Sequence, residues 1–491
     1  MGAKRSAKYL LTTNILGKIF TFIGSIFLAR LLCPEDFGVL LMTSIVTGLV
    51  GMLGNMGFEY FYLQEHTNDS NHERNILNVT FKLRFLLNSI LFLLQYFSSY
   101  AVEEYFSNPM VGDMLRIFAF NHIILVFAQI NIFILRKKLD FRPESIGNLI
   151  GDASGVIMKV MLAWYGLGAL SFAYGYLFGN VFKTVYIMRK QTFVPDIYYW
   201  DSDIFKRVYF FGKHSFVGGI AFYFSGQIEK IIMSSFFPEK LIGGYGFASG
   251  QIRSINSLVN KSLSGLIVSF IAKNKNKPQR LISILSDITY VQYAIMFPVY
   301  IILLFNIDTV IHYLFGEKWN FSVSLFLLFL IYSITALFYS TLSNLLTGLG
   351  YPDVNARLAV YQLIVAGIIL LLTVLITPNI VIYVSVFILI SLLFGIIKVY
   401  IGLQKIGFTF VEFLRYSSFK LSFLFIIISS VVLFVFKMTI DNVWVYFAFS
   451  VMWMLVWFYI FHLKYFRKQF LSALSTLVNK NSKMYQIISQ L

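Results

Sequence analysis

Long apolar runs recur along almost the whole of this sequence, and short polar segments separate them. Each run holds about 20 residues, the length that an α-helix needs to cross the hydrocarbon core of a bilayer. Hydrophobic residues make up 58% of the 491 residues and charged residues only 13%, too few charges for a soluble chain of this length. The sequence therefore predicts an all-α polytopic membrane protein with about fourteen transmembrane helices. The first span follows the basic N-terminal residues, and the others are expected at 38–63, 79–100, 114–135, 145–165, 168–188, 208–236, 242–272, 282–306, 321–347, 358–377, 380–402, 417–437 and 442–463.

Lysine and arginine residues gather in alternate connections between these runs. The intervening connections carry only Arg30, Lys240, Lys318 and Lys437. Because basic loops stay on the cytoplasmic side of a membrane, this alternation predicts that both termini are cytoplasmic. The net charge of +17 then reflects membrane topology, and nucleic acid is not an expected partner.

A weak internal repeat divides the chain. Pro34-Glu35 follows the first span and Pro238-Glu239 follows the seventh, and the offset is a little over two hundred residues. A repeat after six spans keeps the same sense across the membrane, so two parallel six-helix bundles around a central cavity are expected, followed by two C-terminal helices. The predicted parts are an N-terminal bundle at 1–190, a cytoplasmic linker at 191–207, a C-terminal bundle at 208–403, two additional helices at 404–463 and a cytoplasmic tail at 464–491.

Polar residues follow one face of the span near 245–272. Their spacing is i, i+3, i+4, i+7, i+8 and i+11, and they are Arg253, Asn256, Ser257, Asn260, Lys261 and Ser264. A cation in the middle of a span costs at least ~2.5 kcal/mol in lipid, so this face is expected to line a wet cavity or a bundle interior. A cationic, amide-lined cavity suits an anionic or sugar-bearing cargo. A packed polar interface between helices is the alternative.

The first span carries a second polar stripe that includes Lys18. Asp152 and Glu229 are the obvious carboxylates in the middle of spans. They are therefore candidates for coupling transport to H⁺ or Na⁺, and buried ion pairs are the alternative.

No catalytic or phosphate-cradling motif is present in the sequence, and Cys33 is the only cysteine. We therefore expect no enzymatic activity, no cofactor and no metal site.

Several stretches resemble the motifs of Wzx-type polysaccharide flippases, in the same order. They are ARLLCPEDFG at 29–38, RKKLDFR at 136–142 with GLG at 166–168, LIGGYGFA at 241–248 and LFGEKW at 314–319. The resemblance implies the multidrug/oligosaccharidyl-lipid/polysaccharide exporter superfamily, whose two six-helix lobes work by alternating access. It also implies a flippase that moves oligosaccharides on undecaprenyl pyrophosphate across the bacterial cytoplasmic membrane, for O-antigen, capsule or exopolysaccharide synthesis.

On this interpretation the cations of the polar stripes bind the cargo. Lys18, Arg253 and Lys261 attract the pyrophosphate, Arg30 stands at the external mouth, and Asn256 and Asn260 contact sugars. Polysaccharide polymerases and glycosyltransferases are the expected protein partners.

Two other functions remain open at this point. A drug antiporter of the same superfamily is expected to carry acidic cavity residues, and a membrane glycosyltransferase or polymerase is expected to carry acidic catalytic residues in large external loops.

Overall fold

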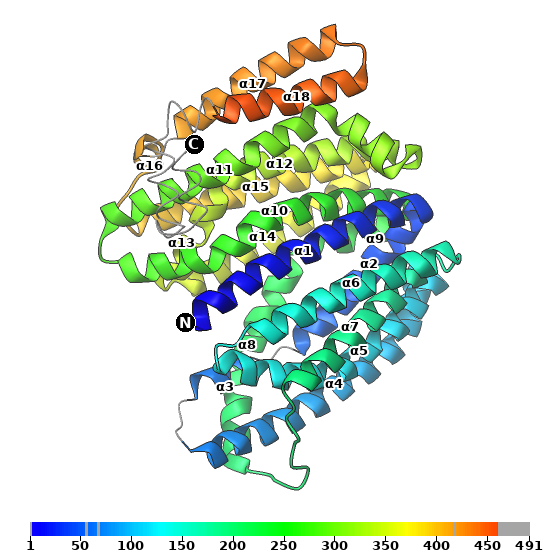
Figure 1. The fold of residues 1–491 in the computed structure, drawn as a ribbon, viewed down its shortest axis with the longest axis vertical. Coiled ribbons are helices and arrows are strands. Elements are labelled where there is room, and N and C mark those ends of the chain that lie inside the picture. The colour runs from blue at the N-terminus through cyan, green and yellow to red at the C-terminus, as the bar shows by residue number, and fades with distance from the viewer. Residues whose placement is uncertain (1, 55–56, 66–68, 417–418, 460–491) are drawn as a thin grey trace. The chain divides into compact units, whose positions relative to one another are not determined.

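The computed structural model describes residues 2–54, 57–65, 69–416 and 419–459, and these residues form helices joined by short connections (Figure 1). The predicted all-α class is therefore confirmed. The chain forms two compact units. Unit 1 is Met1–Phe247 with Gly367–Pro378, and unit 2 is Ala248–Ala366 with Asn379–Leu491.

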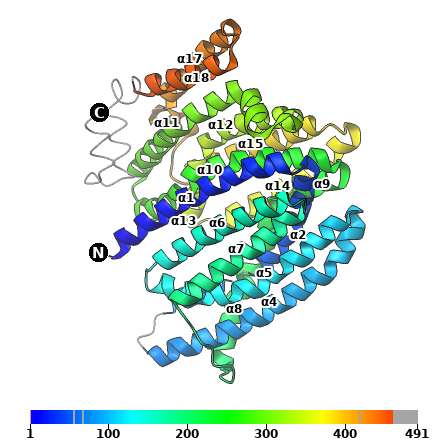
Figure 2. The same cartoon turned by 45° about the vertical axis from the view of Figure 1, so that its right-hand side comes forward.

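Unit 1 is a helical bundle in which α4, α5, α6 and α7 lie side by side and α1 packs on α6 (Figures 1 and 2). Helix α10 (Glu239–Asn274) begins in this unit, and α14 (Pro352–Ile376) ends in it. Its other described helices are α1 (Gly2–Leu31), α2 (Pro34–Leu53), α3 (Phe58–Gln64), α4 (Ser70–Phe106), α5 (Pro109–Lys137), α6 (Arg142–Trp164), α7 (Leu170–Lys190), α8 (Ser202–Ser225) and α9 (Ile228–Phe236).

Unit 2 is built around α11, which contacts α12, α17 and α18, while α12 contacts α15. A hydrogen bond of 3.1 Å from Asn306 Nδ2 to Ser450 Oγ joins α11 to α18. Its described elements besides parts of α10 and α14 are α11 (Pro278–Val310), η1 (Ile311–Phe315), η2 (Glu317–Ser322), α12 (Val323–Ser343), α13 (Leu345–Leu349), α15 (Ile380–Gln404), α16 (Phe410–Tyr416), α17 (Phe419–Thr439) and α18 (Val443–Phe458).

Polar side chains set several helix starts. Asp69, Asn108, Asn379 and Asn442 each accept a hydrogen bond from the amide two residues later, at the N-termini of α4, α5, α15 and α18. Such caps satisfy amides that have no partner inside the helix.

Three predicted spans prove too long, because each is broken. The span at 38–63 ends at Leu53, and the chain turns through Gly57, whose φ of 69° is the left-handed conformation that glycine adopts readily. The span at 208–236 divides into α8 and α9, and the span at 321–347 divides into α12 and α13. The breaks fall at Gly54 and Gly57, at Gly226-Gln227 and at Asn344, and an average of hydropathy over a whole apolar run does not resolve such short interruptions.

In the described part of the chain, nine helices are long and apolar enough to cross a membrane. Two shorter apolar helices, Ile427–Thr439 and Val443–Phe458, follow. The protein is therefore a multi-pass membrane protein, and the number of about fourteen spans stays a prediction. The predicted domain boundaries also stay a prediction, and the tail at 464–491 lies outside the described residues.

Glycines bring α6 and α7 into close contact. A Cβ atom placed on Gly151 would lie 3.1 Å from the carbonyl oxygen of Gly179, and one on Gly155 would lie 3.0 Å from that of Gly175. These backbones approach each other because neither residue has a side chain, as in other small-residue helix interfaces in membranes. The contact fixes the side chains of α7 relative to α6.

Asparagines hold the connection between α7 and α8 on unit 1. The amide of Phe193 donates to Asn131 Oδ1 and that of Asp196 donates to Asn78 Oδ1, both at 2.9 Å. Asp201 then caps α8, which begins at Ser202, before the predicted start at 208. The Ile204 amide that donates to Asp201 lowers the pKa of this carboxyl below its usual range.

The charge alternation gives a labelling prediction. Single cysteines at the exposed positions Glu104 and Thr377 should react with an impermeant maleimide added to intact cells, and cysteines at Asn276 and Gln404 should react only after permeabilisation. The background is Cys33→Ser, because serine is favourable at the N-cap of α2. Reaction at Asn276 in intact cells would contradict the predicted topology.

Candidate functional site

A cavity of about 410 Å³ lies inside unit 1, between α2, α4, α5, α6 and α7. This volume is within the range of small-molecule sites. Its wall combines aromatic rings with many polar side chains. The polar lining residues are Thr47, Glu59, Arg84, Asn88, Asn121, His122, Gln129, Arg136, Glu144, Tyr176 and Lys183.

Local helix geometry explains why the polar groups meet here. On α5, His122, Gln129, Phe133 and Arg136 recur at steps of three, four or seven residues and so lie on one face. At the end of α2, Gly51 has no atom within 4 Å of the place where a Cβ would be. The break after α2 therefore leaves space between the helices, and the face of α5 lines it.

Arg136 binds both acidic residues of the lining. Its Nε donates to Glu144 Oε2 at 2.9 Å and its Nη2 donates to Glu144 Oε1 at 2.5 Å, which makes a two-pronged ion pair. Its Nη1 donates to Glu59 Oε1. A planar guanidinium matches this arrangement, and such bidentate pairs are the strong ones. Both carboxylates thus bind the same cation, and the three side chains together carry a formal charge of −1.

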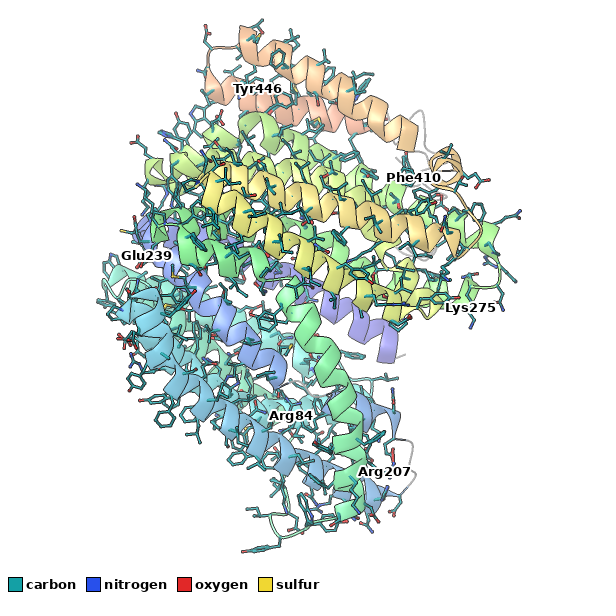
Figure 3. The ribbon with its side chains drawn as sticks, turned by 180° about the vertical axis from the view of Figure 1, so that it is seen from behind. Arg84, Arg207, Glu239, Lys275, Phe410 and Tyr446 are labelled. Carbon is teal, nitrogen blue, oxygen red and sulfur yellow. The ribbon has the colours of Figure 1, made fainter. Side chains whose placement is uncertain are left out.

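Arg84 lies on α4 (Figure 3). Its side chain is buried, and only 4% of its surface is exposed. Its Nη2 donates to Gln129 Oε1, and its guanidinium carbon lies 5.1 Å and 5.5 Å from the ring centres of Phe133 and Phe58. Within the described residues its Nε is buried without a hydrogen-bond partner. A buried donor of this kind costs about 1–3 kcal/mol, so it calls for a ligand or a functional reason.

Lys183 is the third cation of the lining and is half-buried on α7. It makes no hydrogen bond or ion pair in the part of the chain that the structure describes, although Glu144 and Asp152 lie within its electrostatic range. Among the lining residues, Arg84, Arg136 and Lys183 oppose only Glu59 and Glu144. The formal charge of the cavity wall is therefore +1 with His122 neutral.

Neutral groups of the lining also have open hydrogen-bonding positions. Gln95 Nε2 donates to a backbone carbonyl, so its Oε1 accepts from His122 Nε2 at 2.9 Å and leaves His122 Nδ1 as an acceptor. Asn88 uses its Nδ2 on the Arg84 carbonyl, which leaves its Oδ1 as an acceptor. Thr47 Oγ1 is buried without a partner among the described residues. The wall thus offers donors and acceptors together.

Residues 27–324 match the protein family described as polysaccharide biosynthesis protein. The chain belongs to this polysaccharide biosynthesis protein family. Two curated relatives agree with it. An uncharacterized membrane protein in the cps region of Klebsiella pneumoniae is 21% identical over 368 residues, which cover 74% of this chain and 73% of the relative. The succinoglycan biosynthesis transport protein ExoT of Rhizobium meliloti is 23% identical over 146 residues, 29% of this chain and 28% of ExoT.

Solved structures show which fold this family member has. The lipid II flippase MurJ in an inward closed conformation matches with a TM-score of 0.72 and 16% identity, over 94% of this chain and 99% of MurJ. An inward-facing multidrug resistance MATE transporter of the MOP superfamily matches with a TM-score of 0.63 and 15% identity, over 82% of this chain and 98% of that one. The polysaccharide biosynthesis protein described here therefore has this transporter fold. The predicted resemblance to flippases of this superfamily is confirmed.

The predicted site residues of unit 1 lie outside the cavity lining. Lys18 is half-buried and Arg30 is exposed, both on α1. Asp152 lies on α6 against α1, because a Cβ on Gly17 would be 3.0 Å from its Oδ2. Glu229 is buried beside Lys230, whose Nζ lies 3.9 Å from its Oε1, and Tyr245 donates to it at 3.4 Å. Ion coupling through Asp152 or Glu229 stays a prediction.

The predicted site residues of unit 2 lie on α10. Arg253 is exposed and donates from Nε and Nη2 to Ser249, one turn earlier. Asn256 donates to Ser333 Oγ at 3.0 Å and accepts from the Tyr300 hydroxyl. The side chains of Asn260 and Lys261 lie outside the described residues. The cargo-binding roles of all four residues stay predictions.

Sequence reasoning missed the cavity. The alternation of basic connections includes Arg84 and Arg136 among the charges that predict the topology, although Arg84 is buried in α4. A signal was present, because Arg84 and Asn88 are four residues apart and the polar residues of α5 follow one helical face.

Loss of one carboxylate from the Arg136 pair should destabilise unit 1. Glu144→Gln removes the charge of a two-pronged partner, and such charged hydrogen bonds are worth about 1.5–3 kcal/mol. Glu59→Gln should have a smaller effect, since Glu59 accepts from one nitrogen only. The unfolding temperatures of the purified variants in detergent measure which substitution is more destabilising. The control is Asp353→Asn, which breaks an exposed pair with Arg357 and should leave the unfolding temperature unchanged. An unchanged temperature for Glu144→Gln would show that the pair adds nothing to stability.

Proposed function

We propose that this polysaccharide biosynthesis protein is a flippase for oligosaccharides linked to undecaprenyl pyrophosphate. It moves them from the cytoplasmic to the outer leaflet of the bacterial cytoplasmic membrane by alternating access, for cell-surface polysaccharide synthesis. Both termini lie in the cytoplasm. The observation that carries the proposal is Arg253, an exposed guanidinium in the middle of a long helix of a membrane protein with a flippase fold.

The names of related proteins support this class of cargo. One relative lies in a cps region, one is a succinoglycan biosynthesis transport protein, and MurJ is a lipid II flippase. Saccharide export and lipid-linked cargo are the common elements of these names. Polysaccharide polymerases and glycosyltransferases are the partners expected before and after such a step.

The chemistry of Arg253 suits a pyrophosphate. A guanidinium has five N–H donors, and the described bonds of Arg253 use two of its nitrogens on Ser249. Within unit 2, no described carboxylate forms an ion pair with it. Arg253 therefore makes no structural ion pair with the described residues of its own unit. Lys18, which is half-buried on α1 of unit 1, stays a proposed phosphate-binding cation, and so does Lys261, whose side chain lies outside the described residues.

A drug antiporter is the alternative, because multidrug transporters share the fold. Cationic drugs require acidic binding residues. The cavity of unit 1 instead has a formal charge of +1, and Arg253 adds a cation in unit 2. This charge disfavours a cationic cargo.

Removal of Arg253 should impair flipping. Loss of a charged contact costs roughly 1.5–3 kcal/mol, so Arg253→Ala should weaken substrate binding on the order of ten- to a hundred-fold. Arg253→Lys should retain partial activity, because an ammonium keeps the charge but not the fork. The assay is transport of purified lipid-linked oligosaccharide in liposomes.

The matched control for this assay is Arg357→Ala, which removes an exposed arginine at the start of α14 that already pairs with Asp353. It should transport at the normal rate. Full transport by a stable Arg253→Ala protein would remove Arg253 from the site. Transport of cationic drugs in place of lipid-linked sugar would support the antiporter.

Energy coupling is proposed through Asp152 or Glu229, with H⁺ or Na⁺ as the ion. The neutral variants Asp152→Asn and Glu229→Gln keep the size of each side chain and remove its charge. One of them should lose gradient-driven transport in the same liposomes and still reach the membrane. Normal gradient dependence in both variants would exclude both residues.

A further inference from the structure

We propose that the cavity of unit 1 binds an acidic sugar of the hexuronic acid class. Its carboxylate is held by Arg84 and Lys183, and its hydroxyl groups are held by Thr47, Asn88, His122 and Gln129. This inference rests on the proposed function, because it names the chemical class of the transported glycan.

The charge of the cavity favours an anion with one negative charge. Arg136 with Glu59 and Glu144 carries a formal charge of −1. Arg84 and Lys183 remain, and Asp152, which lies near Lys183, also has Lys159 within its electrostatic range. One added negative charge brings the formal charge of the lining to zero. A pyrophosphate would leave a buried negative excess, which a medium of low dielectric constant penalises.

The buried Nε of Arg84 indicates that this guanidinium contacts a ligand. Arg84 is among the most buried cations described, and its Nε has no partner within the described residues. A carboxylate accepts two parallel N–H bonds from a guanidinium, so it satisfies this donor and the charge together.

The neutral groups favour a saccharide over a simple inorganic anion. Asn88 Oδ1 and His122 Nδ1 are acceptors, whereas Gln129 Nε2 is a donor that the described bonds leave open. A chloride ion offers no donor to the two acceptors, and inorganic phosphate offers at most two P–OH donors and no apolar surface. Sugar hydroxyls donate and accept, and they can therefore satisfy these groups and the buried hydroxyl of Thr47. Phe118 and Tyr176 supply apolar surface for the C–H face of a sugar ring.

The test is equilibrium binding of free sugars to the full-length protein in nanodiscs, measured by calorimetry. The probes are D-glucuronate, D-glucose and inorganic phosphate. Glucuronate should bind at least about ten-fold more tightly than either of the others, because only it makes both the charged and the hydroxyl contacts.

Two variants separate the contacts. Lys183→Gln should lower glucuronate affinity about ten-fold and leave glucose affinity unchanged. Thr47→Val should weaken both sugars by the same factor. The matched controls are Lys190→Gln, an exposed lysine two turns further along α7, and Thr43→Val, one turn earlier on α2. Both controls should bind like the original protein. Arg84→Lys tests the bidentate contact between the guanidinium and the carboxylate. If the Arg84→Lys protein does not fold, the Lys183 and Thr47 variants are sufficient to test the site.

The outcomes distinguish this inference from the proposed function. Equal binding of glucose and glucuronate overturns the acidic-sugar site, and equal binding of phosphate and glucuronate overturns the saccharide site. No sugar binding in a protein that still flips lipid-linked oligosaccharide also overturns the inference and leaves the flippase intact. Glucuronate binding that depends on Lys183, in a protein without flipping activity, supports the site and refutes the flippase.

Discussion

The ion pairs of Arg136 decide the chemistry of unit 1. One guanidinium takes both lining carboxylates, Glu144 through two nitrogens and Glu59 through the third. These residues come from α3, α5 and α6, so the network also joins the break after α2 to the α5–α6 connection. Arg136 and its two carboxylates together carry a charge of −1, which offsets half of the +2 of Arg84 and Lys183 and leaves the cavity wall at +1. The positive charge that remains for a ligand therefore lies on Arg84 and Lys183, because Arg136 already binds both carboxylates of the lining.

The packing of α7 against α6 holds the cations of the cavity in place. Lys183 stands on α7, and the Cβ of Lys183 would be 3.1 Å from a Cβ on Gly151 of α6. The backbone contact between Gly151 and Gly179 leaves α7 no room to rotate away, so the lysine is held at the cavity wall. Arg84 is fixed in a similar way by two aromatic rings and Gln129. Rigid placement of this kind is what a binding site requires.

Local sequence patterns predicted the helices. They could not predict contacts between residues that are far apart in the sequence. Apolar runs predicted the helices that are long and apolar enough to cross a membrane. The partner of Arg136, Glu59, is 77 residues away in the sequence, so no spacing rule connects them. Asn256 shows the opposite failure. Its helical spacing suggested a contact with sugars, and the sequence could not show that Ser333 and Tyr300 already use its amide group.

Arg253 and Arg84 differ in burial, and this difference determines which anions each arginine can bind. Arg253 is exposed, so water can share the charge of a pyrophosphate beside it. Arg84 is buried among aromatic rings, where every uncompensated charge is expensive. A polyanion at Arg84 would exceed the single positive charge of that cavity, whereas one carboxylate matches it. On the proposed function, the exposed Arg253 of unit 2 binds the phosphate linkage, and the buried Arg84 of unit 1 binds the carboxylate of the sugar.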